Sequence, residues 1–291
     1  MDESLAHWLR LREEADWAAR SAALTYAIAS AVPNTGMLHV LDLATGTGSN
    51  LRFLCERLPS PQRWLLVDRS LDLLARVQAR TEEWAAARDY EVRPSATGFS
   101  IRAERLSCLV ETRQLDLKAL DDPTLFEGRH LVTASALLDL ASEDWIKALA
   151  ARCRAVDAAA LFTITYDGRS SCDPAEPEDD LVRQLMNEHQ HRDKGLGGPA
   201  AGPDAMAAAE RALEGIGYVV RADASDWVIG PEARAFQREL IDGWALAASE
   251  QQPDAAAAIA GWRTRRLAHV DAGRSRITVG HHDLAAWPRR D

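Results

Sequence analysis

The sequence is poor in cysteine and in long apolar runs, and both shortages narrow the classes of protein to which it can belong. It contains 4 cysteines among 291 residues, without a Cys-x-x-Cys pair or the dense spacing of a disulfide framework. No stretch approaches the roughly 18 consecutive apolar residues of a membrane helix. The first residues, Met1-Asp2-Glu3-Ser4, lack the basic segment and apolar run of a secretory signal. We therefore expect a cytoplasmic protein with free thiols and no membrane partner.

Basic residues are also in the minority. The chain has 34 Lys and Arg against 44 Asp and Glu, which gives a net charge of −10. Nucleic acids and anionic membranes attract basic surfaces, so this balance opposes binding to either. A hydrophobic content of 47% is ordinary for a globular protein and excludes a mainly disordered chain. We expect a small-molecule partner, no nucleic acid, and a monomer or homodimer.

Short apolar runs alternate with segments of helical periodicity, a pattern that indicates a parallel, doubly wound sheet. The expected strands are 38–43, 64–68, 106–115, 130–138, 158–166, 218–228 and 275–280. We therefore predict an α/β fold, with a Rossmann-like, doubly wound, seven-stranded and mostly parallel sheet.

Helical additions are expected around that sheet. The apolar spacing before residue 32 predicts an N-terminal helical cap over 1–36, ahead of a main domain at 37–291. The polar segment 89–104 contains proline and glycine and is interpreted as an insertion. Clustered Pro, Gly, Asp and His make 167–203 a lid loop with one helical piece. Two further helices are predicted to form a helical insertion at 231–270.

The strongest chemical signal is the run DLATGTGSN at 42–50. A glycine-rich turn between a strand and a helix lets the backbone approach a ligand closely, and the helix N-terminus offers free N–H groups. Such a turn can hold a dinucleotide or S-adenosylmethionine. The dinucleotide pattern G-x-G-x-x-G would need its third glycine at position 51, which is Leu51. The acidic Asp42 suits a cofactor with a free ammonium group better than one with a pyrophosphate.

On these residues the chain resembles the class I S-adenosylmethionine-dependent methyltransferases. Their first motif is an acidic residue followed by G-x-G-x-G, and here Ala44 replaces the first glycine. The resemblance covers about 38–166. It implies that Asp42 lies near the methionine ammonium group and that Gly46 and Gly48 allow close backbone approach. The whole predicted cofactor loop comprises Asp42, Ala44, Thr45, Gly46, Gly48 and Asn50.

Later strand ends add to this pattern. Asp68, followed by Arg69, ends the second strand, where a carboxylate can accept both ribose hydroxyls. By the same resemblance, Asp116, followed by Leu117, lies against the adenine amino group. Ser135 lies towards the carboxyl end of the fourth strand and is expected to line the cofactor cleft. Each carboxylate taken alone could be an ordinary strand-terminal residue. Their order and spacing together favour the cofactor site.

A narrower resemblance joins the segment 187–197 to an uncharacterised bacterial group of these enzymes, and it supplies no substrate. Asn187, His189, Asp193 and Lys194 offer an acceptor, an imidazole, an anion and a cation. A solvated polar loop is the alternative interpretation. Histidine is the usual general base near neutral pH, so we predict His189 as the base and Asp139 as the second choice. The other three residues are expected to contact the substrate.

Other residues are also candidates for a functional role, but their sequence patterns are less specific. Arg20, ahead of Arg12, is expected to hold a carboxylate of the cofactor or the substrate, although most helix arginines are simply solvated. Neighbouring His281 and His282 would point to opposite faces of a strand, so we predict no metal. The tryptophans Trp8, Trp17, Trp227, Trp244 and Trp262 are expected to pack in the core or cap, with one of them able to stack on an aromatic substrate.

The predicted function is an S-adenosylmethionine-dependent methyltransferase (EC 2.1.1.-) acting on an O, N or C nucleophile of a small molecule. One alternative is an NAD(P)-dependent oxidoreductase, which would share Asp68 and the parallel sheet but conflicts with Leu51. Another is a non-catalytic S-adenosylmethionine-binding protein, which would keep the cofactor residues and lack a base. The sequence does not specify the acceptor.

Overall fold

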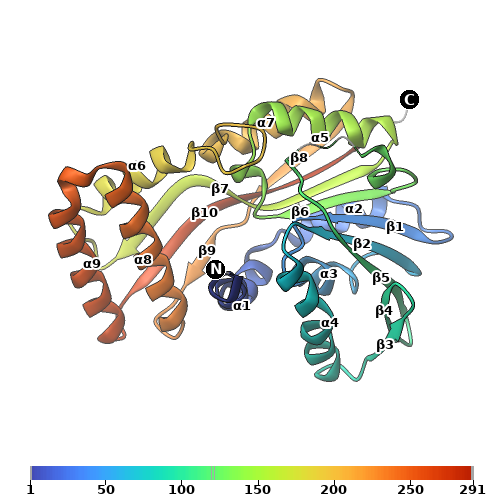
Figure 1. Cartoon of the computed structure of the whole chain (residues 1–291), viewed down its shortest axis with the longest axis horizontal. Coiled ribbons are helices and arrows are strands. Elements are labelled where there is room, and N and C mark those ends of the chain that lie inside the picture. Colours follow the sequence, from blue (N-terminus) through green and yellow to red (C-terminus); the bar gives the residue numbers. More distant parts are fainter. Residues whose placement is uncertain (1, 119, 121, 290–291) are drawn as a thin grey trace.

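The computed structural model describes residues 2–118, 120 and 122–289 (Figure 1). Within them one sheet has the strand order β3-β4-β5-β2-β1-β6-β7-β10-β8, and β9 pairs with β10. The strands are β1 (Leu38–Leu43), β2 (Gln62–Asp68), β3 (Glu91–Ser95), β4 (Gly98–Ala103), β5 (Leu106–Gln114), β6 (Leu131–Ser135), β7 (Ala159–Asp173), β8 (Tyr218–Ala224), β9 (Trp227–Ile229) and β10 (Arg276–Pro288). The helices are α1 (Asp2–Ala19), α2 (Ala22–Ala31), α3 (Ser49–Leu54), α4 (Leu71–Ala86), α5 (Glu143–Ala155), α6 (Asp179–Gln190), α7 (Ala205–Glu214), α8 (Arg234–Gln251) and α9 (Ala256–Asp271).

The centre of the sheet is parallel and doubly wound. Strand β1 pairs in parallel with β2 on one side and with β6 on the other, and β5 and β7 extend the two halves. The chain therefore reverses its direction of winding at β1. Ligands of open α/β sheets bind beyond the carboxyl ends of the strands at such a reversal.

The predicted strand count of seven is wrong, and the sheet is mixed rather than mostly parallel. The segment 89–104, expected to be a polar insertion, forms the β3–β4 hairpin, and β4 pairs antiparallel with β5. Phe99 and Ile101 are buried, while Pro94 lies on the edge strand, where its missing N–H costs no ladder bond. Strand β10 runs antiparallel to β7, β8 and β9.

Both faces of the central strands are covered by helices. Along β1, Leu41 and Leu43 belong to a buried cluster with residues of α5 and α7, whereas Leu38 and Val40 belong to one with residues of α2, α3 and α4. Side chains alternate between the two faces of a strand, so a strand buried on both sides is mostly apolar. This explains why four of the six residues of β1 are apolar.

Strands β7 and β10 extend beyond the central parallel strands and carry a cap of α6, α8 and α9, seen at one end of Figure 1. The long β7 bends at Ile164, whose φ of 54° is left-handed. That conformation is rare for a β-branched residue. The Ile164 N–H donates to Asp283 Oδ1 at 2.9 Å, next to a register shift between His282 and Leu284. The segment 167–203 thus contributes the end of β7, helix α6 and a turn region.

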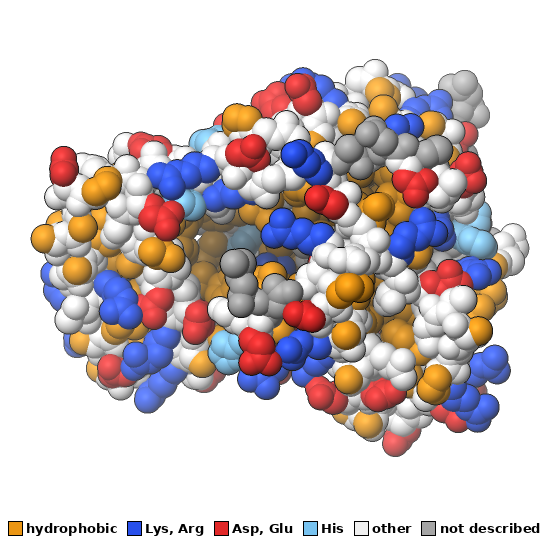
Figure 2. Space-filling view, in the orientation of Figure 1, with side chains coloured by type: hydrophobic (Ala, Val, Ile, Leu, Met, Phe, Trp, Pro, Cys, Tyr) orange, Lys and Arg blue, Asp and Glu red, His pale blue; other side chains and the backbone are white. Residues whose placement is uncertain are grey.

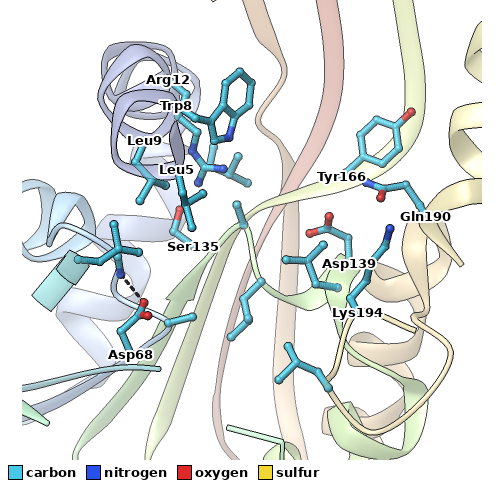
Figure 3. Close-up of a pocket in the computed structure, with 18 of the residues that line it drawn as sticks. Leu5, Trp8, Leu9, Arg12, Asp68, Ser135, Asp139, Tyr166, Gln190 and Lys194 are labelled. Atoms are coloured by element: carbon cyan, nitrogen blue, oxygen red, sulfur yellow. Dashed lines mark hydrogen bonds between the residues drawn. The ribbon is translucent and has the colours of Figure 1, made fainter. Parts of the chain in front are cut away.

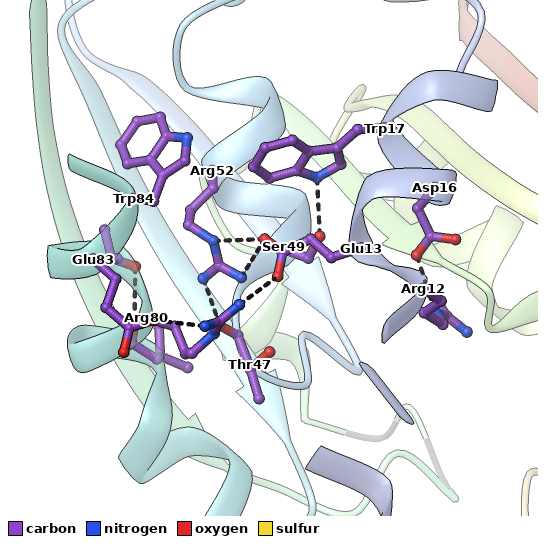
Figure 4. A network of polar contacts seen from close by, with 12 residues as sticks. Arg12, Glu13, Asp16, Trp17, Thr47, Ser49, Arg52, Arg80, Glu83 and Trp84 are labelled. Carbon is purple, nitrogen blue, oxygen red and sulfur yellow. Dashed lines mark hydrogen bonds and ion pairs between the residues drawn. The ribbon is translucent and has the colours of Figure 1, made fainter. Parts of the chain in front are cut away.

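Helix α1 lies between the cap and the sheet and is fixed by a buried ion pair (Figure 4). Glu13 Oε1 accepts hydrogen bonds from Arg52 Nε at 2.9 Å and Nη2 at 2.7 Å, and its Oε2 accepts one from Arg80 Nη2 at 3.2 Å. Arg52 Nη1 also donates to the Thr47 carbonyl at 2.7 Å. The helix is therefore tied through Arg52 to the glycine-rich turn. None of the helices in the described ranges is long and apolar enough to span a membrane.

Candidate functional site

A cavity of about 490 Å³ lies between the carboxyl ends of the parallel strands and the cap (Figure 3). The strand ends contribute Ala44, Gly46, Asp68, Leu115 and Ser135; helix α1 contributes Leu5, Trp8, Leu9 and Arg12; and the cap side contributes Tyr166, Met186, Gln190, Lys194, Leu240 and Trp244. The surface is hollowed between the α8–α9 end and the middle of the molecule (Figure 2). The cavity therefore sits at the reversal of winding.

The glycine-rich turn shapes one wall of this cavity. Ala44, Gly46 and Gly48 have φ values of 51°, 56° and 81°, all left-handed, which explains why glycine suits these positions. A side chain on Gly46 would come within 2.9 Å of Leu9 Cδ1. The backbone N–H of Gly46 donates to Asp68 Oδ2 at 2.8 Å. The turn is thus held between the end of β2 and helix α1.

Asp42 is completely buried beneath the turn. Its Oδ2 accepts a hydrogen bond from Thr45 Oγ1 at 2.5 Å, and its Oδ1 accepts one from Asn50 Nδ2 at 2.6 Å. Burial raises the pKa of Asp42 to about 6 despite both bonds. Asn50 in turn accepts a bond from Arg20 Nη1 at 2.7 Å. The structure joins these four predicted residues in one network.

Arg20 lies at the inner end of that network rather than on the cavity wall. Its Nε and Nη2 are buried and have no hydrogen-bond partner in the described part of the chain, and its guanidinium lies 4.3 Å from the centre of the Phe53 ring. Burial lowers the pKa of Arg20 to about 10. Arg20 therefore orients Asn50, and through it Asp42.

A smaller cavity of about 40 Å³ adjoins the main one at the turn. Asp42, Thr45, Asn50, Arg12 and Asp16 line it, and it shares Ala44, Gly46, Leu9 and Ser135 with the larger cavity. Arg12 Nε donates to Asp16 Oδ2 at 3.0 Å, and Asp16 Oδ1 accepts a bond from Trp227 Nε1 at 3.0 Å. Sequence reasoning placed Arg12 second to Arg20 and missed Asp16. Arg12 and Asp16 are one helical turn apart, and this spacing is the sequence feature that could have indicated their pairing.

The remaining cofactor positions predicted from the sequence lie together on the sheet side. Asp68, Arg69, Asp116, Leu117 and Ser135 all line the main cavity. Asp68 Oδ1 accepts a hydrogen bond from the backbone N–H of Ser70 at 2.9 Å. Asp116 is exposed, and its Oδ1 accepts one from the backbone N–H of Lys118 at 2.9 Å. Leu117 is buried beside it. This half of the cavity combines apolar surface with carboxylates at two strand ends.

The cap half of the cavity is aromatic. Trp8 of α1, Trp227 of β9, Trp244 of α8 and Tyr166 of β7 line it together with His281 of β10. The ring centres of Trp8 and Trp227 lie 6.3 Å apart, and those of Trp227 and His281 lie 4.4 Å apart. These residues come from five elements that are distant in the sequence. No sequence pattern connects them.

Asp139 brings a carboxyl group into the cap half. It lies in the 3-10 turn Leu138–Leu140, is 7% exposed, and its Oδ1 has no hydrogen-bond partner among the residues described. Burial raises the pKa of Asp139 to about 6, although backbone hydrogen bonds from Asp139 and Tyr166 and the charges of Arg12 and Lys194 act in the opposite direction. Asp139 lines the cavity, so its carboxyl group is close to any ligand bound there.

Of the four residues predicted in 187–197, only Lys194 lines the cavity. His189 lies behind it, with Nδ1 at 3.3 Å from Lys194 Nζ and Nε2 at 3.1 Å from a glutamate oxygen of α8. Asn187 accepts a hydrogen bond from the Tyr166 hydroxyl at 2.7 Å, and Asp193 accepts one from a neighbouring backbone N–H. The structure therefore separates His189, Asn187 and Asp193 from the cavity wall.

No protein-family model matches this chain, and no curated protein matches its sequence. Its fold is similar to that of solved structures. A cyclopropane synthase from Mycobacterium tuberculosis matches over 90% of this chain and 83% of its own, with 12% identity and a TM-score of 0.43. A methyltransferase from Geobacter sulfurreducens, in complex with S-adenosylhomocysteine, matches over 93% and 92%, with 15% identity and a TM-score of 0.40. The protein YcgJ from Bacillus subtilis matches over 93% and 100%, with 12% identity and a TM-score of 0.47.

Proposed function

We propose that this chain is an S-adenosylmethionine-dependent methyltransferase that transfers a methyl group to an O, N or C nucleophile of a small molecule. One observation carries the proposal. A single cavity at the reversal of winding joins a half built from the glycine-rich turn and strand-end carboxylates to an aromatic half that contains Asp139. The first half suits a nucleoside cofactor, and the second gives an acceptor an enclosed place beside it.

The side chains at the sheet end fit the parts of this cofactor. Asp68 would accept the ribose hydroxyls, and Asp116 would face the adenine amino group. Arg12 would hold the carboxylate, since it lines both cavities, and the carboxyls of Asp42 and Asp16 lie in the small cavity where the ammonium group would bind. The bound cofactor supplies a methyl group on a positively charged sulfur, which is an electrophile.

The protein contributes alignment, exclusion of water and one proton acceptor. Leu5, Trp8 and Leu9 of α1 cover the cavity, which shields the reacting groups from solvent. Asp139 would take the proton of the nucleophile. We propose Asp139 ahead of His189 because Asp139 lines the cavity, whereas His189 lies behind Lys194.

Binding measurements test the cofactor assignment. S-adenosylhomocysteine at a hundredfold excess over its Kd should stabilise the folded protein by about 2.7 kcal/mol, while NADH should have no effect. Asp68→Ala should abolish that stabilisation, and the matched variant Asp72→Ala, at an exposed position in the next helix, should retain it. Stabilisation by NADH alone would reject the proposal.

Turnover separates an enzyme from a protein that only retains the cofactor. Cell extract supplied with methyl-labelled cofactor should yield a labelled small molecule when the wild-type chain is added. Tight binding without any transfer across such extracts would favour a binding protein. The dinucleotide alternative also conflicts with Leu51, whose side chain is fully buried at the position where a third glycine would be needed.

A further inference from the structure

The cap half of the cavity has the aromatic surface of a site for a flat ring. Trp8, Trp227, Trp244 and Tyr166 reach it from four different elements, so aromatic surface surrounds the space on several sides. Aromatic side chains bind other rings by offset-stacked or edge-to-face contact. The Trp227 ring is itself held by the hydrogen bond from its Nε1 to Asp16. A fixed wall of this kind selects planar ligands over flexible chains.

Two groups on this wall accept hydrogen bonds. One is the carboxylate of Asp139, which lines the cavity. The other is His281, which is 4% exposed and whose Nδ1 lies 3.1 Å from the Val279 carbonyl oxygen. A carbonyl can only accept, so Nδ1 carries the proton and Nε2 is left as an acceptor. Burial lowers the pKa of His281 to about 4, which keeps the ring neutral.

The cations near these acceptors are already balanced. Arg12 is paired with Asp16. Lys194 lies within hydrogen-bond distance of His189 Nδ1, and its charge and that of Asp139 favour each other's ionised form. Among the residues that the structure describes, no unpaired cation is left in this half for a phosphate or a carboxylate. Neutral ligands with donor groups are therefore favoured.

We propose that the methyl acceptor is a neutral aromatic or heteroaromatic ring that carries two O–H or N–H donors, one facing Asp139 and the other facing His281. The transfer itself rests on the proposed function above, but recognition of the ring does not. In the transfer, the oxygen or nitrogen facing Asp139 gives its proton to that carboxylate and forms the bond to the methyl carbon. The carbon–sulfur bond breaks, and its electron pair returns to sulfur.

Fragment binding to the full-length chain tests the recognition without turnover. The probes are catechol, 2,3-dihydroxynaphthalene and 5-hydroxyindole, which place two donors at different spacings. Each is paired with its doubly methylated counterpart, and decalin-2,3-diol serves as a saturated control. Quenching of tryptophan fluorescence should show at least one probe binding about tenfold more tightly than its methylated counterpart and than the saturated diol. The proposal is overturned if no probe binds or if methylation makes no difference.

Variants locate the effect in the cavity. His281→Phe keeps an aromatic ring and removes the acceptor, so the preference for the donor-bearing probe should fall about tenfold, the effect of one hydrogen bond. The matched control His282→Phe changes a neighbour outside the cavity lining and should keep the preference. If His281→Phe does not fold, Trp244→Leu provides the second test and should weaken every ring probe. Unchanged binding in the folded variant would overturn the proposal.

The same preparations distinguish this inference from the proposed function. Binding of S-adenosylhomocysteine without any preference for donor-bearing rings would reject the inference and leave the cofactor assignment standing. Ring preference without binding of S-adenosylhomocysteine would reject the methyltransferase and leave the ring site standing.

Discussion

Three buried carboxyl groups near the cavity share a raised pKa but differ in their partners. Asp42 accepts hydrogen bonds from Thr45 and Asn50, and Asp16 accepts them from Arg12 and Trp227. Asp139 differs from both because its Oδ1 has no partner among the described residues. Burying an unpaired acceptor is costly, so such a group is expected where a ligand supplies the missing donor.

If Asp139 is the general base, the enzyme activity should depend on pH. Only its ionised form can accept a proton, and its pKa is raised to about 6. The value of kcat/KM should therefore rise with pH through about 6 and level off above it. Asp139→Asn should lower kcat/KM by about 10²–10⁴-fold and remove this limb. The measurement is kcat/KM against pH for wild type, Asp139→Asn and His189→Ala. If the rise with pH disappears in His189→Ala and not in Asp139→Asn, His189 is the general base.

Asp139 should also make the folded protein less stable at neutral pH. Its raised pKa means that the folded chain binds the proton more tightly than the unfolded chain between about pH 4 and pH 6. Its contribution to stability therefore falls as pH rises through this window. Asp139→Asn should be more stable than wild type by up to about 3 kcal/mol above this window, and the difference should vanish near pH 4. Denaturant unfolding at several pH values measures it, and a constant difference would contradict the cause given.

Helix α1 combines a lining face with an anchored end. Leu5, Trp8 and Leu9 face the cavity, and Glu13 one turn later is paired with Arg52, which is 1% exposed. Burial lowers the pKa of Arg52, and the charge of Glu13 acts in the opposite direction. The ion pair therefore stabilises the buried charge of the guanidinium. Removing one partner of such a pair leaves an uncompensated charge, which is more destabilising than losing a surface ion pair.

Glu13→Gln should therefore lower the free energy of unfolding by about 3–5 kcal/mol and weaken binding of S-adenosylhomocysteine. The neighbouring Glu14 is exposed, so Glu14→Gln is a matched control that should change stability by less than about 0.5 kcal/mol. Urea unfolding and calorimetric titration of both variants provide the comparison. Equal effects of the two substitutions would show that the ion pair does not fix α1.

The whole molecule consists of a sheet covered on both faces and a cap with its own buried cluster. The cap cluster includes Ile164 and Trp262, and it is separate from the two clusters that cover the sheet. Strands β7 and β10 connect the two parts, and the cavity lies where α1 closes the space between them. A ligand in the cavity contacts both parts, so binding should couple them.

Hydrogen exchange should reveal that coupling. Saturation with S-adenosylhomocysteine should increase the protection of amides in 3–12, 44–50 and 135–140, because these segments line the cavity. The β3–β4 hairpin lies at the far edge of the sheet and should not change. Mass spectrometry of peptides from both regions gives the comparison. Equal protection of the hairpin would indicate general stabilisation instead.

The sequence by itself determined the parallel doubly wound core and the turn at 42–50. A buried strand corresponds to a short apolar run in the sequence, and a glycine-rich turn has its own local sequence pattern. Both can therefore be recognised from a few consecutive residues. Asp42, Asp68 and Ser135 lie at the carboxyl ends of their strands, Asp116 follows that of β5, and parallel strands bring those ends to one edge. This is why these four residues lie together around the two cavities.

Only the tertiary structure decided the aromatic half of the cavity and the extra strands. The aromatic wall is assembled from α1, β7, β9, α8 and β10, whose residues share no spacing in the chain. The sequence favours His189 over Asp139 as the base, and the position of His189 behind the cavity wall depends on how α6 packs against α8. The β3–β4 hairpin was hidden because an edge strand tolerates proline and polar residues. Long-range packing, which local patterns do not encode, fixed these features.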